Sequence, residues 1–349
     1  MNIFVDMHHG ALYASLQRLF ENRLGHNLFR PIGEEWATSG NWLLAKPYSD
    51  HPSTITQYLG IRNLKYDPYK YLNEVREKKD NYYVIADAFK DHKAVTLEQF
   101  KEMEIDIVIA SYLPHFPIYK ELVKRYHPKA KLILQMGNEW AVDFNEVKNI
   151  LSSTYPFKVP SGVNAVFYHQ EFDTGVYRYE KPQPTNKMRS FVHTLMAQDM
   201  FKQDWSDFLT LQSYMPEYLF ESFGAACRDG VVSGDILIAE KMRASFFGIH
   251  EKQGGDGYGY VIHQWAASGR PLIYRGSQYT KRLASKLLVN LVTGIDLDMM
   301  SIPDASKLIS GLSPEQHELM CENVYNRFRE SVDFNKETED IKLFLERLN

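Results

Sequence analysis

The sequence predicts an α/β protein made of two doubly wound domains that face a central cleft, followed by a C-terminal helix. Apolar runs of strand length alternate with helical patterns in both halves of the chain. A polar stretch with two prolines, 177–189, separates the halves. Runs that are apolar throughout are typical of parallel strands covered on both faces. Because parallel strands bind ligands at their carboxyl ends, each domain is expected to hold one ligand at the cleft.

Composition restricts the class of protein. The chain has 349 residues, of which 44% are hydrophobic and 24% charged, as in soluble globular proteins. No apolar run approaches the roughly 20 residues of a transmembrane helix, and the first residues lack the pattern of a signal peptide. Two cysteines predict a reducing compartment, so we expect a cytoplasmic protein (in the host cytoplasm, if phage-encoded). The net charge of −4 argues against nonspecific coating of nucleic acid but permits a local basic groove.

In the first half, the run 2–9 is rich in β-forming residues and is predicted as a strand. Leucines and Phe20 then recur at helical spacing over Ala11–Gly25, with Gly25 at the C-cap position. A second strand is expected over 26–33. The other elements predicted in this half are strands over 82–89, 105–112 and 131–138, and a helix near 119–127.

The second half repeats this alternation. Strands are predicted over 188–195, 218–224, 245–252 and 270–276, and helices over 203–215, 235–245 and up to Ser268. The tail is helical by periodicity, with Ser313 as N-cap and Pro314 in the first turn. The domains are therefore expected to span 1–180 and 181–325, with a helical tail over 326–349.

A glycine-rich segment, GGDGYG at 254–259, lies between a predicted strand and a predicted helix. Its spacing does not fit the dinucleotide pattern G-x-G-x-x-G, and it lacks the lysine and hydroxyl of a P-loop. Backbone amides at such a turn, with the helix dipole, suit an anionic oxygen. A flexible connection between strand and helix is the alternative.

The longer segment DGYGYVIHQWAASGRPLI resembles the donor-site motif of GT-B glycosyltransferases, E-G-F-G-(four residues)-E-A-M-A-x-G-x-P. The resemblance implies two Rossmann-like domains and a nucleotide-sugar donor substrate, with UDP-sugar expected, and no tightly bound cofactor. Asp256 takes the place of the first glutamate, which contacts sugar hydroxyls in this family. Gln264 takes that of the second, which binds the ribose, and an amide binds a hydroxyl less strongly than a carboxylate does. Gly257 and Gly259 match the glycines.

Basic groups are expected near the donor, because a nucleoside diphosphate leaving group develops negative charge. Lys252 is the first candidate, since it ends a predicted strand at the edge of the cleft. Arg270, and Lys241 with Arg243, are the other basic residues near the loop in the sequence. Gly255 would contribute a backbone amide to the same site. An ordinary solvated surface charge is the alternative interpretation of each basic residue.

The predicted catalytic residues follow the first strand. His8 or His9 is the candidate base that deprotonates the acceptor hydroxyl, and Asp6 would orient it. Side chains alternate along a strand, so Asp6 and His8 would share a face. Helix capping and sheet packing are the alternative roles of these histidines.

Other predicted strands place polar residues at the same edge of the first domain. His115 follows the strand predicted over 105–112, and Asn138 and Glu139 follow that over 131–138. These three are the candidate acceptor-side residues, with loop structure as the alternative. The pair Asp296 and Asp298 matches the D-x-D metal motif of related enzymes, but its position makes a chance match the better interpretation, and no metal site is predicted.

The segment Arg62–Lys79 interleaves basic residues with tyrosines. Such a pattern can follow a phosphate backbone and stack bases, although a solvated helix face explains it as well. Some enzymes of the resembled fold glycosylate hydroxymethylated pyrimidines in phage DNA. The expected function is therefore sugar transfer to an acceptor hydroxyl on DNA or on a glycan. The alternatives are a non-catalytic nucleotide-sugar-binding protein and a nucleotide-sugar epimerase of the same fold.

Overall fold

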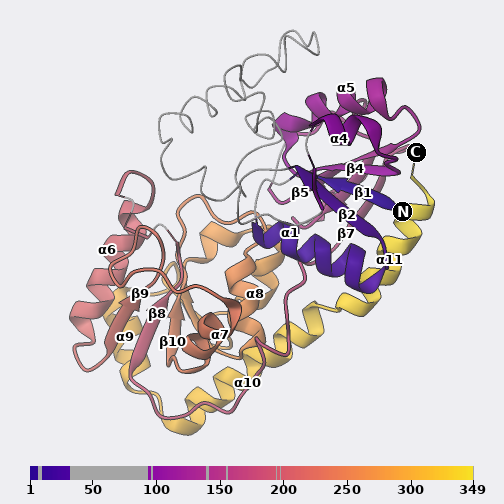
Figure 1. Ribbon diagram of the computed structural model, residues 1–349. Helices are drawn as coiled ribbons and strands as arrows, with labels where there is room; N and C mark the ends of the chain where they lie inside the picture. The colour runs from indigo at the N-terminus through magenta and orange to yellow at the C-terminus, as the bar shows by residue number, and fades with distance from the viewer. Residues whose placement is uncertain are drawn as a thin grey trace. The chain divides into compact units, whose positions relative to one another are not determined.

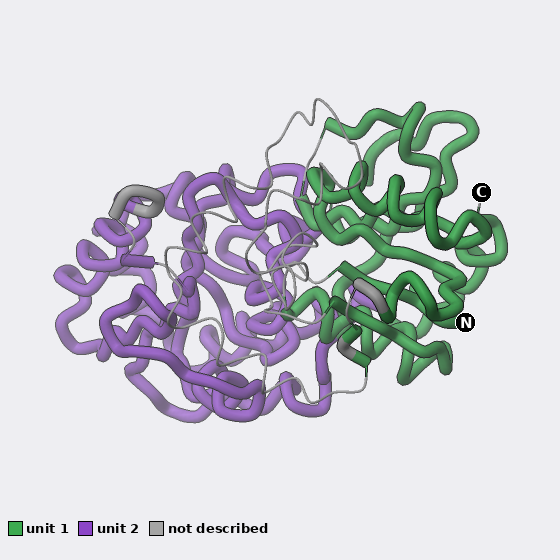
Figure 2. The backbone as a smooth tube through the Cα atoms, turned by 45° about the horizontal axis from the view of Figure 1, so that its top comes forward, with its two compact units in different colours: residues 1–171, 334–349 green, residues 172–333 purple. Residues whose placement is uncertain are grey.

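The computed structural model describes residues 1–6, 10–31, 93–95, 97–138, 141–154, 156–193, 195–196 and 198–348. The chain forms two compact units, one of residues 1–171 with 334–349 and one of residues 172–333 (Figure 2). Each unit contains a parallel sheet with helices (Figure 1). The strand predicted over 82–89 and the basic segment 62–79 lie outside the described residues. No helix in the described part of the chain is both long and apolar enough to cross a membrane.

The first unit contains a seven-stranded sheet in the order β3-β2-β1-β4-β5-β6-β7, with every described pairing parallel. Its strands are β1 (Asn2–Val5), β2 (Asn27–Pro31), β3 (Ala94–Val95), β4 (Ile107–Ala110), β5 (Lys131–Met136), β6 (Asn149–Ser152) and β7 (Asn164–Phe167). Strands β1, β2, β4 and β5 confirm four predicted strands. The sequence analysis did not predict β6 and β7, which lie among polar and proline-containing loops.

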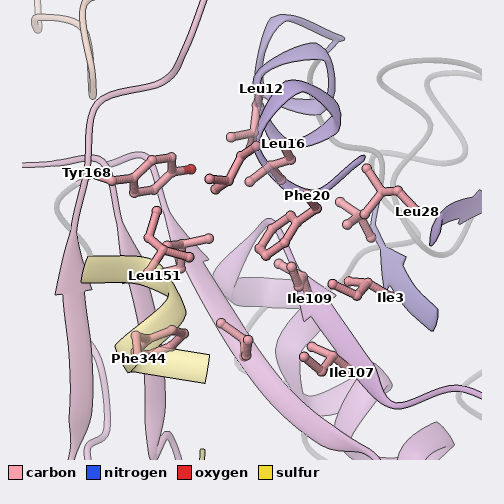
Figure 3. Packing of buried hydrophobic residues seen from close by; sticks show 14 of the residues in the cluster. Ile3, Leu12, Leu16, Phe20, Leu28, Ile107, Ile109, Leu151, Tyr168 and Phe344 are labelled. Atoms are coloured by element: carbon pink, nitrogen blue, oxygen red, sulfur yellow. The ribbon is translucent and has the colours of Figure 1, made fainter. Parts of the chain in front are cut away.

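Helices cover both faces of this sheet. They are α1 (Gly10–Gln17), which continues as the π-helical turn η1 (Arg18–Arg23), α4 (Leu97–Glu102), α5 (Phe116–Tyr126) and α11 (Phe334–Glu346). Along β4, Val108 packs in the cluster that includes α4 and α5 residues. Its neighbours Ile107 and Ile109 pack with residues of α1, η1 and α11, as Figure 3 shows for Leu16, Phe20 and Phe344. The alternation explains why the strand is apolar at every position.

The last helix, α11, belongs to the first unit. Both carboxylate oxygens of Glu337 accept hydrogen bonds from His169, one from its backbone nitrogen at 2.7 Å and one at Nδ1 at 2.6 Å. Asn164 of β7 donates to the backbone oxygen of Phe344 at 3.0 Å. These bonds hold α11 against β7 and the segment that follows it.

The second unit has a five-stranded parallel sheet in the order β12-β11-β10-β8-β9. Its strands are β8 (Lys187–Ser190), β9 (Leu219–Ser222), β10 (Phe247–Ile249), β11 (Leu272–Tyr274) and β12 (Gly294–Asp296). Its helices are α6 (Gln198–Tyr214), α7 (Asp235–Arg243), α8 (Tyr260–Ala267), α9 (Ile302–Ser310) and α10 (Pro314–Ser331). Ser313 and Gln316 form a capping box at the start of α10, which confirms the predicted N-cap.

Close packing of α8 on β10 depends on Gly248. A Cβ atom there would lie 2.7 Å from Cε2 of Trp265 and 2.6 Å from Cδ2 of Leu272. Trp265 is fully buried. The absence of a side chain at Gly248 therefore lets α8 approach the sheet, and this contact positions the loop that joins the two elements.

The strand order reverses once in each sheet, between β1 and β4 in the first unit and between β8 and β10 in the second. Chain connections leave in opposite directions on the two sides of such a point, which opens a crevice at the carboxyl ends of the strands. Asp6 follows β1, Ser111 follows β4, and the glycine-rich segment follows β10. The topology thus places these residues where ligands bind in such folds.

Candidate functional site

The loop from His250 to Gly259 is held by side chains from two other elements. The backbone nitrogen of Lys252 donates to Oε1 of Gln278 at 2.6 Å, and that of Gln253 donates to Asp204 at 2.6 Å. Nε2 of Gln278 donates to the other Asp204 oxygen at 3.0 Å. Asp204 lies in α6 and Gln278 in η7 (Gly276–Tyr279). The loop is therefore a turn with fixed backbone contacts and not a flexible connection.

Gly255 is required by this arrangement. Its φ is +74°, and a Cβ atom would lie 2.2 Å from the backbone oxygen of Gln278. Gly259 has a φ of +81° at the start of α8, where a Cβ atom would lie 2.8 Å from Cβ of Ala284. The glycines allow the backbone to turn tightly between β10 and α8.

Asp256 is the charged centre of the loop. Its Oδ2 lies 3.0 Å from Nε2 of His250, and its Oδ1 is paired with Nζ of Lys252. Burial raises the pKa of this carboxyl, but the His250 hydrogen bond and the Lys252 charge outweigh it and hold the pKa well below its usual range. Asp256 is therefore ionised at neutral pH and can accept hydrogen bonds from hydroxyl groups.

The other predicted donor-side residues have different surroundings. Gln264 lies in α8, is 4% exposed, and follows His263, whose ring stacks on Tyr258 at 4.3 Å between centroids. The Lys252 side chain is 36% exposed, at the surface beside Asp256. Gly257 lies between Asp256 and Tyr258 in the loop. The second unit thus brings Lys252, Asp256 and the glycines together in one turn.

Arg270 is used differently from the predicted role. It is 1% exposed, and its guanidinium donates to the backbone oxygens of Arg243 at 2.8 Å, Glu180 at 3.1 Å, Ser268 at 3.2 Å and Gly269 at 3.1 Å. These four carbonyl contacts leave little of the guanidinium for a ligand. Donor binding by Arg270 stays a prediction that these contacts do not support.

A carboxylate cluster around Arg275 was not anticipated from the sequence. Arg275 follows β11 and contacts Asp207 at 2.5 Å, Glu251 at 3.2 Å and Asp298 at 3.1 Å. Glu251 is 1% exposed and directly precedes Lys252. Burial and the neighbouring Asp207 raise the pKa of Glu251 well above its usual value. The sequence feature that could have indicated this cluster is the position of Glu251 and Arg275, each just after one of two strands that are neighbours in the sheet.

The raised pKa of Glu251 predicts a pH dependence of stability. The folded protein holds this proton more tightly than the unfolded chain, whose glutamate ionises near pH 4.5. Stability therefore falls as the pH rises above about 4.5, until the folded-state pKa is reached. Glu251→Gln removes this ionisation, so its melting temperature should fall less than that of the wild type between pH 5 and pH 8.

Thermal unfolding followed by circular dichroism across this pH range measures the difference. Glu240→Gln, at an exposed position on α7, is the matched control and should follow the wild-type curve. Parallel curves for Glu251→Gln and the wild type would show that Glu251 does not carry a raised pKa.

In the first unit, the structure joins two predicted residues at the reversal point. Oδ2 of Asp6 lies 2.9 Å from Nδ1 of His115, and both side chains are fully buried. Oδ1 of Asp6 accepts a hydrogen bond from Tyr119 at 3.1 Å, and the Asp6 backbone oxygen accepts one from Ser111 at 2.6 Å. Asp6 therefore joins β1 to the segment after β4 and to α5, and it orients His115.

Of the four other residues predicted for the site in the first unit, the structure describes only Asn138. His8, His9 and Glu139 lie outside the described residues. Asn138 is exposed, two residues after the end of β5. The roles of these four residues stay predictions.

Within the described residues, no group of three or more His, Cys, Asp or Glu side chains is arranged to hold a metal ion. The D-x-D pair has structural partners. Asp296 accepts hydrogen bonds from the backbone nitrogens of Gly276 and Asp298, each at 2.9 Å. Asp298 accepts from Arg275 and, at 2.8 Å, from the backbone nitrogen of Ser277. These bonds fix the turn after β11.

Comparison with known proteins identifies the fold. No protein-family model and no curated protein matches the sequence. Among solved structures, Anabaena HepE in complex with UDP and glucose is 10% identical, with a TM-score of 0.59 over 99% of each chain. An E. coli protein, described as trehalose-6-phosphate bound with UDP-2-fluoro glucose, is 10% identical, with a TM-score of 0.61 over 100% of this chain and 99% of that one.

A third similar structure is an alpha-glucosyltransferase in complex with UDP. It is 12% identical, with a TM-score of 0.54 over 97% of this chain and 98% of that one. Identities of 10–12% establish the fold alone. The chain is therefore an α/β protein of two Rossmann-like units with the GT-B fold of glycosyltransferases.

Proposed function

We propose that this protein is a glycosyltransferase that moves a sugar from a UDP-sugar donor to an acceptor hydroxyl. The observation that carries the proposal is the Asp256 carboxylate, which is ionised and held by a fixed glycine turn at the carboxyl end of β10. It lies beside the reversal of strand order in the second sheet. Similar structures that contain UDP, UDP and glucose, or UDP-glucose support the donor class.

Different residues of the second unit bind different parts of the donor. Asp256 accepts hydrogen bonds from hydroxyls of the transferred sugar, a hexose or a pentose. The exposed ammonium of Lys252 offsets the charge that develops on the diphosphate as it leaves. Gln264 binds the ribose, and the amides of Gly255, Gly257 and Gly259 face the donor. The first unit, residues 1–171 with 334–349, supplies the acceptor side.

In the reaction, the acceptor oxygen bonds to the anomeric carbon, and the bond from this carbon to the diphosphate oxygen breaks. A base takes the proton of the acceptor hydroxyl. The acceptor belongs to one of two classes, a glycan or a hydroxymethylated pyrimidine in DNA.

A donor and acceptor panel tests the proposal with the full chain. UDP-glucose, UDP-galactose and UDP-N-acetylglucosamine are each incubated with oligosaccharides and with DNA that contains hydroxymethylcytosine. Transfer of labelled sugar with release of UDP is the expected result. Tight UDP binding without turnover would instead assign a non-catalytic binding protein, and an altered sugar formed from donor alone would assign an epimerase.

The role of His8 or His9 as the base is tested by a separate prediction. We expect His8→Ala or His9→Ala to lower kcat by about 100-fold or more, the usual contribution of general base catalysis, with UDP affinity unchanged. Initial rates of transfer and calorimetric titration with UDP provide the two measurements. His26→Ala, at a half-buried position in the first unit, is the control. Full activity in both variants would show that neither histidine is the base.

A further inference from the structure

The two partners of the Asp256 carboxylate differ in how firmly they are held. His250 is 2% exposed, and its backbone oxygen accepts a hydrogen bond from the buried Tyr279 hydroxyl at 3.2 Å. The Lys252 side chain is 36% exposed, whereas its backbone is fixed: its nitrogen donates to Gln278 and its oxygen accepts from Gly255. A ligand that enters from solvent can displace the flexible ammonium of Lys252, whereas it cannot reach His250 without disrupting the core.

The surroundings of His250 also determine which ring nitrogen carries the proton. Nδ1 is buried and has no hydrogen-bond partner among the described residues, whereas Nε2 lies 3.0 Å from Asp256. A proton on Nδ1 would be buried without an acceptor, which costs free energy. An ionised carboxylate only accepts hydrogen bonds, so Nε2 carries a proton and donates it to Oδ2 of Asp256.

A carboxylate with one oxygen fixed by a buried donor has a defined orientation. Its other oxygen, Oδ1, is paired with the ammonium of Lys252, whose side chain is 36% exposed. Rigid support of this kind matters in catalysis, because a misplacement of about 1 Å in a positioning group can cost about 100-fold in rate.

We propose that His250 is the positioning residue of the donor site, which holds Asp256 through Oδ2 so that Oδ1 receives the sugar hydroxyls once Lys252 turns to the diphosphate. The proposal rests on the proposed function. It divides the turn into two parts, with His250 and Asp256 acting on the sugar and Lys252 acting on the nucleoside diphosphate. The two parts respond differently to UDP and to UDP-glucose.

Two substitutions at His250 separate positioning from simple packing. His250→Leu fills the space without a donor, and we expect kcat with UDP-glucose to fall by about 10- to 100-fold while UDP affinity stays within threefold of the wild type. His250→Gln places an amide N–H near the original Nε2 and should recover kcat to within about threefold. Lys252→Met should have the opposite effect, on binding: UDP affinity should weaken about tenfold through loss of a charged hydrogen bond.

His317→Leu is the matched control for the loss of a buried histidine. His317 is 4% exposed in α10 and bonds to the backbone oxygen of Phe246 at 2.7 Å, and it takes no part in the glycine turn. This variant should melt at a lower temperature but keep its kcat below that temperature. A purely structural role of His250 would produce the same pattern in His250→Leu.

Rates are measured at a temperature at which every variant is folded by circular dichroism, and affinities by calorimetry with UDP and with UDP-glucose. Wild-type kcat in His250→Leu, or equal losses in His250→Leu and His250→Gln, would overturn the inference while leaving the proposed function intact. Equal weakening of UDP binding in His250→Leu and Lys252→Met would overturn it as well. Absence of turnover in the wild type with every donor would remove the proposed function and this inference together.

Discussion

Asp256→Ala is expected to lower kcat for transfer from UDP-glucose by about 100- to 1,000-fold, the usual cost of removing one preorganised group that acts on the transition state. The ionised carboxylate is the only side chain in the described glycine turn, 254–259, that carries a charge. Its loss removes the acceptor for the sugar hydroxyls but leaves Lys252 available to the diphosphate. UDP affinity should therefore change by less than about threefold.

Steady-state kinetics with UDP-glucose and calorimetric titration with UDP measure the two effects. Asp256→Asn keeps the shape and one carbonyl oxygen without the charge, so its kcat should lie between those of Asp256→Ala and the wild type. Asp304→Ala, in the first turn of α9, is the control for loss of an exposed aspartate in the same unit. Transfer at more than a third of the wild-type rate by Asp256→Ala would exclude Asp256 as a catalytic residue.

Arg270→Met is expected to destabilise the second unit by about 3–5 kcal/mol, because each buried carbonyl left without a donor costs about 1–3 kcal/mol. Arg270 donates to four backbone oxygens, from α7, from the segment before β8 and from its own turn. Urea unfolding followed by circular dichroism should show a lower transition midpoint, together with normal UDP affinity in the folded protein.

Arg178→Met is the control for loss of an exposed arginine in the same unit, since its side chain is 63% exposed. Its unfolding should lie within about 0.5 kcal/mol of the wild type, as for most surface substitutions. If Arg270→Met instead kept wild-type stability and lost UDP binding, Arg270 would be a donor ligand, as the sequence motif suggested.

Local patterns were sufficient for the elements with strong signals. The runs that became β1, β4 and β5 are mostly apolar because most of their residues are buried in the sheet. Ser313 and Pro314 marked the start of α10 because capping chemistry depends on a few adjacent residues. Strands β6 and β7 were missed because four residues in a polar context give too short a pattern to distinguish from a loop.

In the site, too, local sequence patterns were sufficient for some residues and insufficient for others. The glycines and Asp256 could be found from the sequence, because the turn and its charge lie within one short segment. The roles of Arg270 and Arg275 could not, because a basic residue after a strand can face a ligand, backbone carbonyls or carboxylates. Their partners, among them Asp207 and Glu180, are distant in the sequence and meet them only in the folded chain.

The sequence by itself determined the α/β class, the alternation of strands and helices, and the glycine turn with its acidic residue, because these depend on periodicity and on neighbouring residues. Only the tertiary structure decided that Asp6 is paired with His115, that His250 supports Asp256, and that α11 packs on the first unit. Burial and hydrogen bonding between residues far apart in the chain depend on packing, which local patterns do not record.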